Sequence, residues 1–171
     1  MRPILPTDRD ELRDHVVEDW GSTNVATRGR LVDVITHAGF MAEDFGEWLG
    51  YATYELRGGE LEISTLSTEH RRRGAGSALI AACVRAAVDA KATRVWLITT
   101  NDNIPAIRFY QRRGFVLVAL HPGSVDEMRR TIKPEIGLLG ADDIPIRDEL
   151  ELELPVDAWP PFLEKYEWPS T

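Results

Sequence analysis

The sequence predicts an α/β (α+β) domain in which helices cover both faces of a mixed central sheet. Strand-like and helix-like segments alternate through the middle of the chain, which is typical of a sheet covered by helices. The length of 171 residues and the 43% apolar composition are those of one ordinary globular domain. The same composition excludes disordered, collagen-like and disulfide-dense chains.

The first part of the chain predicts one helix and then several strands. We expect a helix over residues 8–20, because apolar residues recur there at helical spacing and Thr7 can cap its start. Three strands are expected, at residues 40–42, 48–56 and 61–68. The last two strands flank Arg57, Gly58 and Gly59. This turn predicts that they form an antiparallel hairpin.

The second part alternates helices with strands. An alanine-rich helix is expected from Gly76, and Asn103 can cap a further helix that ends at Gly114. Strands are expected at residues 94–100, 115–120 and 147–154, and a short polar helix at 124–131. We therefore expect a single domain over residues 1–154. The remaining tail, 155–171, is rich in Pro and Trp and is expected to pack on this domain or on a second subunit.

Charge is distributed unevenly along the chain. The net charge is −8, yet residues 71–114 carry 9 basic residues against 2 acidic ones. This distribution favours a polyanionic ligand held locally, with acidic surroundings that attract a cation; scattered solvated charge is the alternative.

The single Cys83 and the polar N-terminus favour a cytoplasmic protein. No run of residues is apolar enough to cross a membrane.

The most informative segment is Leu66–Ile80, where a strand, a turn with three Arg and two Gly, and a helix follow one another. Free N–H groups and the positive dipole end at a helix start suit a phosphate group. The segment lacks the Lys of a Walker A loop and the third Gly of a Rossmann motif. A nucleic-acid patch would need aromatic residues among the Arg residues and a wider basic face. We therefore expect a bound pyrophosphate.

Two motifs resemble those of the GNAT N-acetyltransferase superfamily. Arg71, Gly74 and Gly76 fit its acyl-CoA signature between a strand and a helix. The second motif follows the next strand and comprises Asn103, Ala106, Tyr110, Gly114 and Phe115. The resemblance covers residues 61–120, about a third of the chain. It implies the GNAT fold, with a mixed central sheet of six to seven strands and helices on both faces.

The resemblance also implies an N-acetyltransferase that uses acetyl-CoA as cosubstrate, with direct attack by an amine in a ternary complex. The pantetheine arm would bind the backbone of Leu66, Ser67 and Thr68, and the Leu66 amide would polarise the thioester carbonyl. The pyrophosphate would bind Arg71, Arg72, Arg73, Gly74, Ala75, Gly76 and Ser77. Asn103 would contact the cofactor, and this role is compatible with helix capping.

Two residues are candidates for proton transfer. Tyr110 would protonate the departing thiolate as in the family, and a core tyrosine is the alternative. Glu62 is our candidate for the base that deprotonates the amine, directly or through water. Glu60 lies on the same face by the strand period of two and remains an alternative, as does a structural role for Glu62. The four His residues are isolated, so no metal is expected, and Cys83 is expected in the core.

The acceptor is expected to be a small cationic amine because acidic residues dominate outside the cofactor segment. A protein N-terminal or lysine acetyltransferase and a non-catalytic acyl-CoA sensor are the alternatives. Neither a nucleic acid nor a membrane is expected as a partner, and a homodimer is possible. Residues 20–23 with Arg28 and Gly29 lie where the family forms its acceptor wall, or they simply turn the chain.

Overall fold

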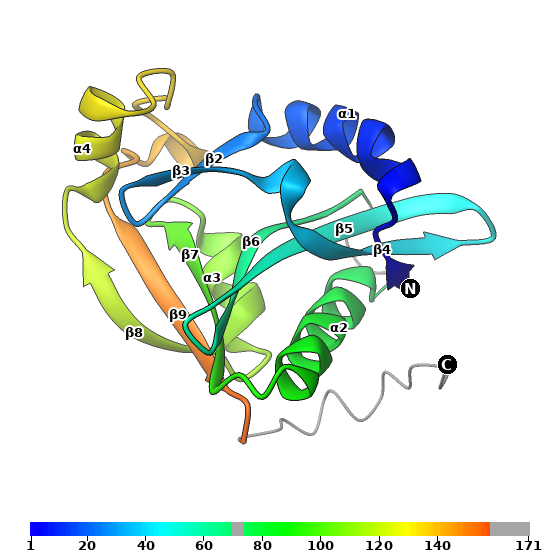
Figure 1. The fold of residues 1–171 in the computed structure, drawn as a ribbon. Helices are drawn as coiled ribbons and strands as arrows, with labels where there is room; N and C mark the ends of the chain where they lie inside the picture. The colour runs from blue at the N-terminus through cyan, green and yellow to red at the C-terminus, as the bar shows by residue number, and fades with distance from the viewer. Residues whose placement is uncertain (70–73, 158–171) are drawn as a thin grey trace.

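A mixed sheet forms the centre of the molecule in the computed structural model, which describes residues 1–69 and 74–157 (Figure 1). In these residues the sheet has seven strands in the order β1-β4-β5-β6-β7-β9-β8. The strands are β1 (Arg2–Pro3), β4 (Ala38–Asp44), β5 (Glu47–Arg57), β6 (Glu60–Thr68), β7 (Arg94–Thr100), β8 (Val116–His121) and β9 (Glu149–Pro155). Among the strands of the described residues, only β6 and β7 pair in parallel.

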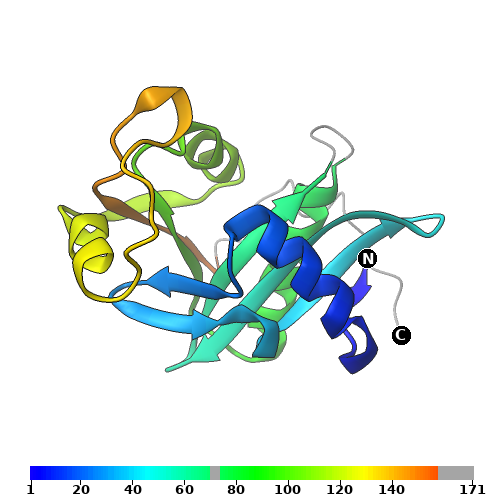
Figure 2. The same cartoon turned by 90° about the horizontal axis from the view of Figure 1, so that it is seen from above.

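Helices cover both faces of this sheet, as the sequence predicts. One face carries α2 (Ala75–Asp89) and α3 (Ile104–Gln111), and the opposite face carries α1 (Arg9–Trp20), as Figures 1 and 2 show. The remaining helical segments are α4 (Ser124–Thr131) and the short turns η1 (Pro6–Asp8), η2 (Val34–Thr36) and η3 (Ala141–Asp143). No helix of the described ranges is long and apolar enough to cross a membrane.

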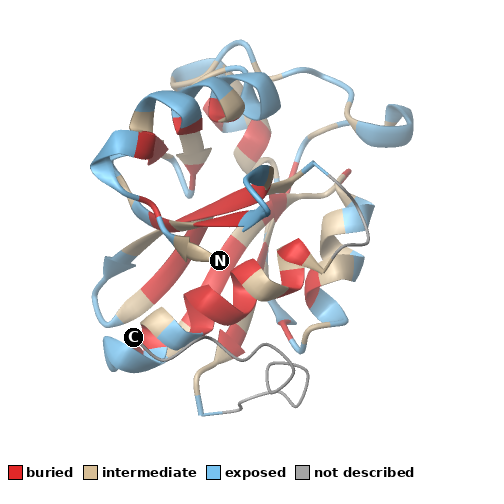
Figure 3. Ribbon diagram, turned by 90° about the vertical axis from the view of Figure 1, so that its right-hand side faces the viewer, coloured by how far each residue is buried: buried red, intermediate tan, exposed pale blue. Residues whose placement is uncertain are grey.

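Two apolar clusters hold the layers together. The larger one lies between the sheet and α2, where the fully buried Leu79, Ile80 and Cys83 contact strand residues. Figure 3 shows this buried face of α2. The smaller cluster lies under α1 and includes Leu12 and Val16, both fully buried. The helical spacing of these residues in the sequence therefore predicts their burial correctly.

The last strand, β9, presents different chemistry to the two faces. Its sequence alternates Glu and Leu, and successive side chains of a strand point to opposite faces. Leu152 and Leu154 join the core beneath α2. Glu149 and Glu151 are also buried, at 2% and 5% exposure, and lie on the opposite face. This face of the sheet therefore buries carboxyl groups, which requires polar partners.

The N-terminal part differs from the prediction. The strands β2 (Asn24–Thr27) and β3 (Arg30–Asp33) form a separate hairpin, where the sequence indicated an acceptor wall or a turn and no strands. At its tip, Arg28 and Gly29 have positive φ, which glycine adopts readily. The helix cap is Asp8 rather than Thr7, because η1 takes up residues 6–8. Arg2 binds the buried Asp8 carboxylate from β1.

Candidate active site

The strands β6 and β7 stay paired only at their starts. The register joins Leu61 to Val95 and Glu62 to Trp96, and no later pair follows among the described residues. Beyond Glu62, β6 continues to Thr68, bonded to β5 on its other side. The predicted pantetheine-binding residues Leu66, Ser67 and Thr68 lie on this continuation. Their side of β6 therefore offers backbone groups to which an extended ligand could add.

A β-bulge precedes these residues. Thr53 pairs with Thr65 whereas Tyr54 pairs with Ile63, so Ser64 is the additional residue in β6. The Ser64 hydroxyl lies 2.9 Å from Nδ1 of His37. A bulge bends its strand and re-aims the residues that follow. The bulge therefore sets the direction of β6 just before Leu66. No pattern in the sequence indicates a bulge at this position.

The turn before α2 has the geometry that its glycines suggest. Gly74 caps α2 at φ 80°, a left-handed conformation. A Cβ on Gly76 would lie 2.9 Å from Cζ of Phe109, so this glycine also allows α3 to approach α2. Ala75 and Ser77 follow in the first turn of α2. The predicted pyrophosphate residues Arg71, Arg72 and Arg73 lie outside the described residues.

The remaining cofactor-side predictions fall on α2 and α3. Ser77 is buried, and its hydroxyl accepts a hydrogen bond of 2.9 Å from Nε of Arg113. The Asn103 side chain accepts a hydrogen bond from the Ala106 amide at 3.2 Å. The capping role predicted for Asn103 is confirmed. Its cofactor contact stays a prediction.

Tyr110 belongs to the core between α2 and α3. It is 7% exposed, and its ring packs edge-on against Phe109 and Phe115. Burial raises the pKa of its phenol. Cys83 lies in the same cluster, fully buried, and burial raises the pKa of its thiol to about 12. The predicted core position of Cys83 is confirmed, whereas the acid role of Tyr110 stays a prediction.

Glu62 lies on the opposite face, close to the point where β6 leaves β7. It is 4% exposed, and residues of the β2–β3 hairpin bind both of its oxygens. Thr27 donates to Oε1 at 2.6 Å, and Arg30 donates to Oε2 at 3.1 Å. Burial raises the pKa of Glu62 above its ordinary value, although Thr27 and Arg30 oppose this shift. A carboxylate with a raised pKa accepts protons more readily.

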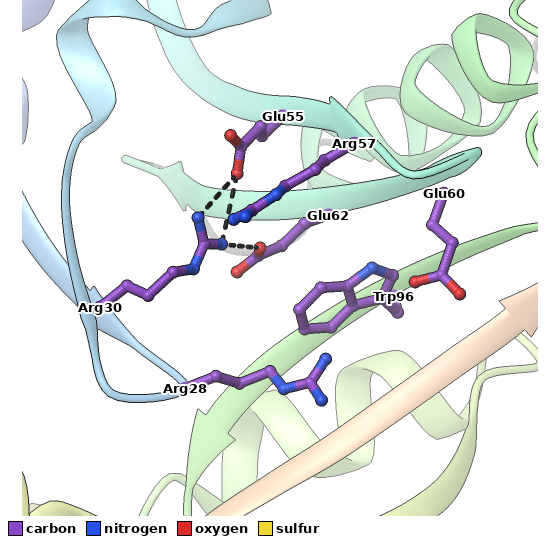
Figure 4. Close-up of a pocket in the computed structure, with 7 residues that line it drawn as sticks. All are labelled: Arg28, Arg30, Glu55, Arg57, Glu60, Glu62 and Trp96. Atoms are coloured by element: carbon purple, nitrogen blue, oxygen red, sulfur yellow. Dashed lines mark hydrogen bonds and ion pairs between the residues drawn. The ribbon is translucent and has the colours of Figure 1, made fainter.

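A cavity of about 330 Å³ opens beside Glu62 (Figure 4). Its lining is almost entirely charged and consists of Arg28, Arg30, Glu55, Arg57, Glu60, Glu62 and Trp96. The Arg28 guanidinium lies over the Trp96 ring at 5.1 Å, and Arg30 also reaches Glu55 at 3.3 Å. No motif in the sequence indicates that Arg30, Glu55, Arg57 and Trp96 line a cavity. For Arg28 the sequence indicates an acceptor wall or a turn, and the structure places it at the hairpin tip beside the cavity.

Glu60, the alternative base, lies at the same cavity but is held differently. Its carboxylate pairs with Arg94 at 3.0 Å, and Arg94 also binds Glu151 and Glu153. The buried Glu149 lies further along this face, and burial raises its pKa. The described residues contain no group of His, Cys, Asp and Glu side chains that could hold a metal ion. The carboxylates of Glu62 and Glu60 at this cavity support acid–base chemistry.

Comparison with known proteins identifies the family. The model of the acetyltransferase (GNAT) family matches residues 8–115. The uncharacterized protein YdhI of Bacillus subtilis is 36% identical over 163 residues, which cover 92% of this chain and 100% of YdhI.

Solved structures share the fold. A Bacillus subtilis acetyltransferase in complex with CoA matches with a TM-score of 0.60 at 19% identity, over 85% of each chain. Nourseothricin acetyltransferase matches with a TM-score of 0.62 at 22% identity, over 91% of this chain and 96% of that one. The GNAT fold and the acetyl-CoA-dependent acetyltransferase class predicted from the two motifs are thereby confirmed. This chain belongs to the GNAT family of acetyltransferases.

Proposed function

We propose that the protein transfers the acetyl group of acetyl-CoA to a primary amine of a small molecule, by direct attack within a ternary complex. One observation carries this proposal. Glu62, a buried carboxylate whose pKa is raised, borders a cavity on the strand that separates from β7 immediately afterwards. A proton acceptor and an open strand edge thus occur within four residues of each other on β6.

The donor side is supported by the geometry of β6 and α2. The backbone of Leu66, Ser67 and Thr68 would bind the pantetheine arm, and the Leu66 amide would donate to the thioester oxygen. The start of α2, from Gly74 to Ser77, would bind the pyrophosphate together with Arg71, Arg72 and Arg73. Asn103 would contact the cofactor from the start of α3.

The acceptor amine needs a base. A primary amine with a pKa near ~10.4 is about 3.4 units from neutrality, a cost of roughly 4.6 kcal/mol at pH 7. Glu62 would take this proton directly or through water. Glu60 is a weaker candidate because its carboxylate is bound by Arg94. Once the amine attacks, the thiolate leaves, and Tyr110 would protonate it.

The size of the cavity favours a small acceptor. About 330 Å³ accommodates a compact molecule, and the charged lining fits a polar one. The size and lining of the cavity therefore support a small-molecule amine over a protein N-terminus or lysine side chain.

The test is a broad amine screen with acetyl-CoA and detection of free CoA. The panel should contain polyamines, aminoglycosides, streptothricin-type compounds, amino acids and short peptides. We expect CoA release that depends on one class of small amine. Binding of acetyl-CoA with no release from any acceptor would instead support an acyl-CoA sensor, and release with peptides alone would support a protein acetyltransferase.

A further inference from the structure

The three arginines of the cavity are not equivalent. Arg30 bridges two carboxylates, Glu55 and Glu62, that lie directly opposite each other on β5 and β6. Without a cation between them, two such carboxylates would repel. Arg28 lies over Trp96 and reaches Glu151 at 3.9 Å. Both guanidinium groups therefore already have carboxylate partners within the protein.

Arg57 differs from the other two. It is exposed, ends β5, and makes no hydrogen bond or ion pair with any other residue in the described ranges. By the strand period of two it lies on the same face as Glu55. In Figure 4 its side chain runs from the end of the strand toward the part of the cavity where Arg30 holds Glu55. The cavity thus contains a guanidinium that forms no ion pair with another described residue.

The order of groups along the two strands gives the cavity a direction. Leu66, where the thioester would lie, is four residues beyond Glu62 on β6. On β5, Glu55 is paired with Glu62, and Arg57 follows two residues later. Because β5 and β6 are antiparallel, Arg57 and Leu66 lie on opposite sides of the Glu55–Glu62 pair. Two residues of a strand span about 7 Å. A ligand whose amine lies between the thioester and Glu62 would therefore extend toward Arg57.

We propose that the acceptor carries a carboxylate in addition to its amine, and that Arg57 binds this carboxylate. This inference rests on the proposed function, because it assumes that the amine lies at Glu62. A guanidinium binds a carboxylate through two parallel hydrogen bonds. A doubly charged phosphate fits less well, because Glu55, Glu60 and Glu62 also line the cavity and would repel it. Diamino acids and short basic peptides carry such a pair of groups, a side-chain amine and a carboxylate.

The experiment compares matched acceptors that differ only in the carboxylate. Lysine is paired with cadaverine and ornithine with putrescine. Initial rates of CoA release give kcat/KM for each compound, and calorimetry measures binding of the same compounds to the enzyme loaded with CoA. Because CoA carries no acetyl group, the second measurement proceeds without turnover.

The variants are Arg57→Gln and Arg57→Lys, with Arg85→Gln as control because Arg85 is exposed on α2. In the wild type we expect the amino acid of each pair to bind about tenfold more tightly than its decarboxylated partner. Arg57→Gln should abolish this preference and leave cadaverine binding within twofold of the wild-type value. Arg57→Lys should retain part of the preference, and Arg85→Gln all of it.

The possible results separate the two proposals. Equal binding within each pair, or equal weakening of both members by Arg57→Gln, would overturn the carboxylate site even if amines are acetylated. A preference for the amino acids that depends on Arg57, without CoA release from any acceptor, would support the carboxylate site and contradict the proposed acetyl transfer.

Discussion

The part of the sheet under α2 and the part under the β2–β3 hairpin, on the opposite face, differ in chemical character. The face under α2 is apolar, and its residues recur at the regular spacings of a helix and of strands. The face under the β2–β3 hairpin buries Glu62, Glu149 and Glu151 and is held by ion pairs and hydrogen bonds. The partners on this second face are far apart in the sequence, 35 residues for Thr27 and Glu62 and 59 for Arg94 and Glu153.

This difference between the two regions indicates which residues contribute mainly to stability and which contribute mainly to function. Apolar burial stabilises the fold roughly in proportion to the area removed from water. Buried carboxylates cost desolvation free energy that their partners only partly return. The position of Glu62 beside the cavity favours a role in function over a role in stability. We therefore expect changes on the α2 face to lower stability and changes on the hairpin face to lower activity.

Glu62→Gln should give the largest effect. Gln can still accept the hydrogen bond from Thr27, but it cannot take a proton from the amine. We expect kcat/KM for the acceptor to fall about 10²-fold to 10⁴-fold, with the KM for acetyl-CoA nearly unchanged. Steady-state kinetics on the best acceptor of the screen measures both. Glu60→Gln is the matched control, and a larger loss in that variant would make Glu60 the base.

The same carboxylate should set the acid limb of the pH profile. A base acts only when ionised, so kcat/KM should fall as the pH drops through the pKa of Glu62. Burial raises this pKa above the ordinary value of 4.5, so the limb should lie above pH 4.5. Glu62→Gln should lose this limb. An identical limb in the variant would assign it to another group.

The contrast between the faces also explains what could be predicted from the sequence. Local signals predicted α2, the β5–β6 hairpin, the Asn103 cap and the short polar helix α4. The cavity could not be predicted, because Arg30, Glu55 and Trp96 meet only through the way in which β3, β5, β6 and β7 come together. The one local signal was the Arg28-Gly29-Arg30 segment, whose glycine marks the hairpin turn.

Leu79→Ala tests the apolar face. Leu79 is fully buried between α2 and the sheet, so its truncation leaves a cavity that the rigid core cannot fill. We expect a loss of about 2 to 5 kcal/mol in the free energy of unfolding, measured by urea denaturation. The exposed Val88 on the same helix is the control, and Val88→Ala should cost less than about 0.5 kcal/mol. Equal losses in both variants would contradict the packing described for α2.

Tyr110→Phe tests a residue that belongs to the apolar face but has a proposed catalytic role. The ring contacts with Phe109 and Phe115 survive this change, so stability should hardly alter. Burial raises the pKa of the phenol, which makes it a weak acid toward a thiolate of pKa near ~8.5. We expect kcat to fall only about 10-fold to 10²-fold, with the KM for acetyl-CoA nearly unchanged. A variant with the wild-type kcat would show that Tyr110 is a core residue with no role in catalysis.

Asn103 should give the smallest effect and can separate its two roles. Asn103→Ala removes the hydrogen bond to the Ala106 amide and should lower the free energy of unfolding by about 1 kcal/mol. Asn103→Asp keeps the capping oxygen but removes the side-chain N–H groups. The stability of Asn103→Asp should match that of the wild type. If the side-chain N–H groups contact the cofactor, the KM for acetyl-CoA should rise in both variants. An unchanged KM in Asn103→Asp would show that Asn103 acts only as a helix cap. The proposed cofactor-binding residues would then be those of β6 and of the turn before α2.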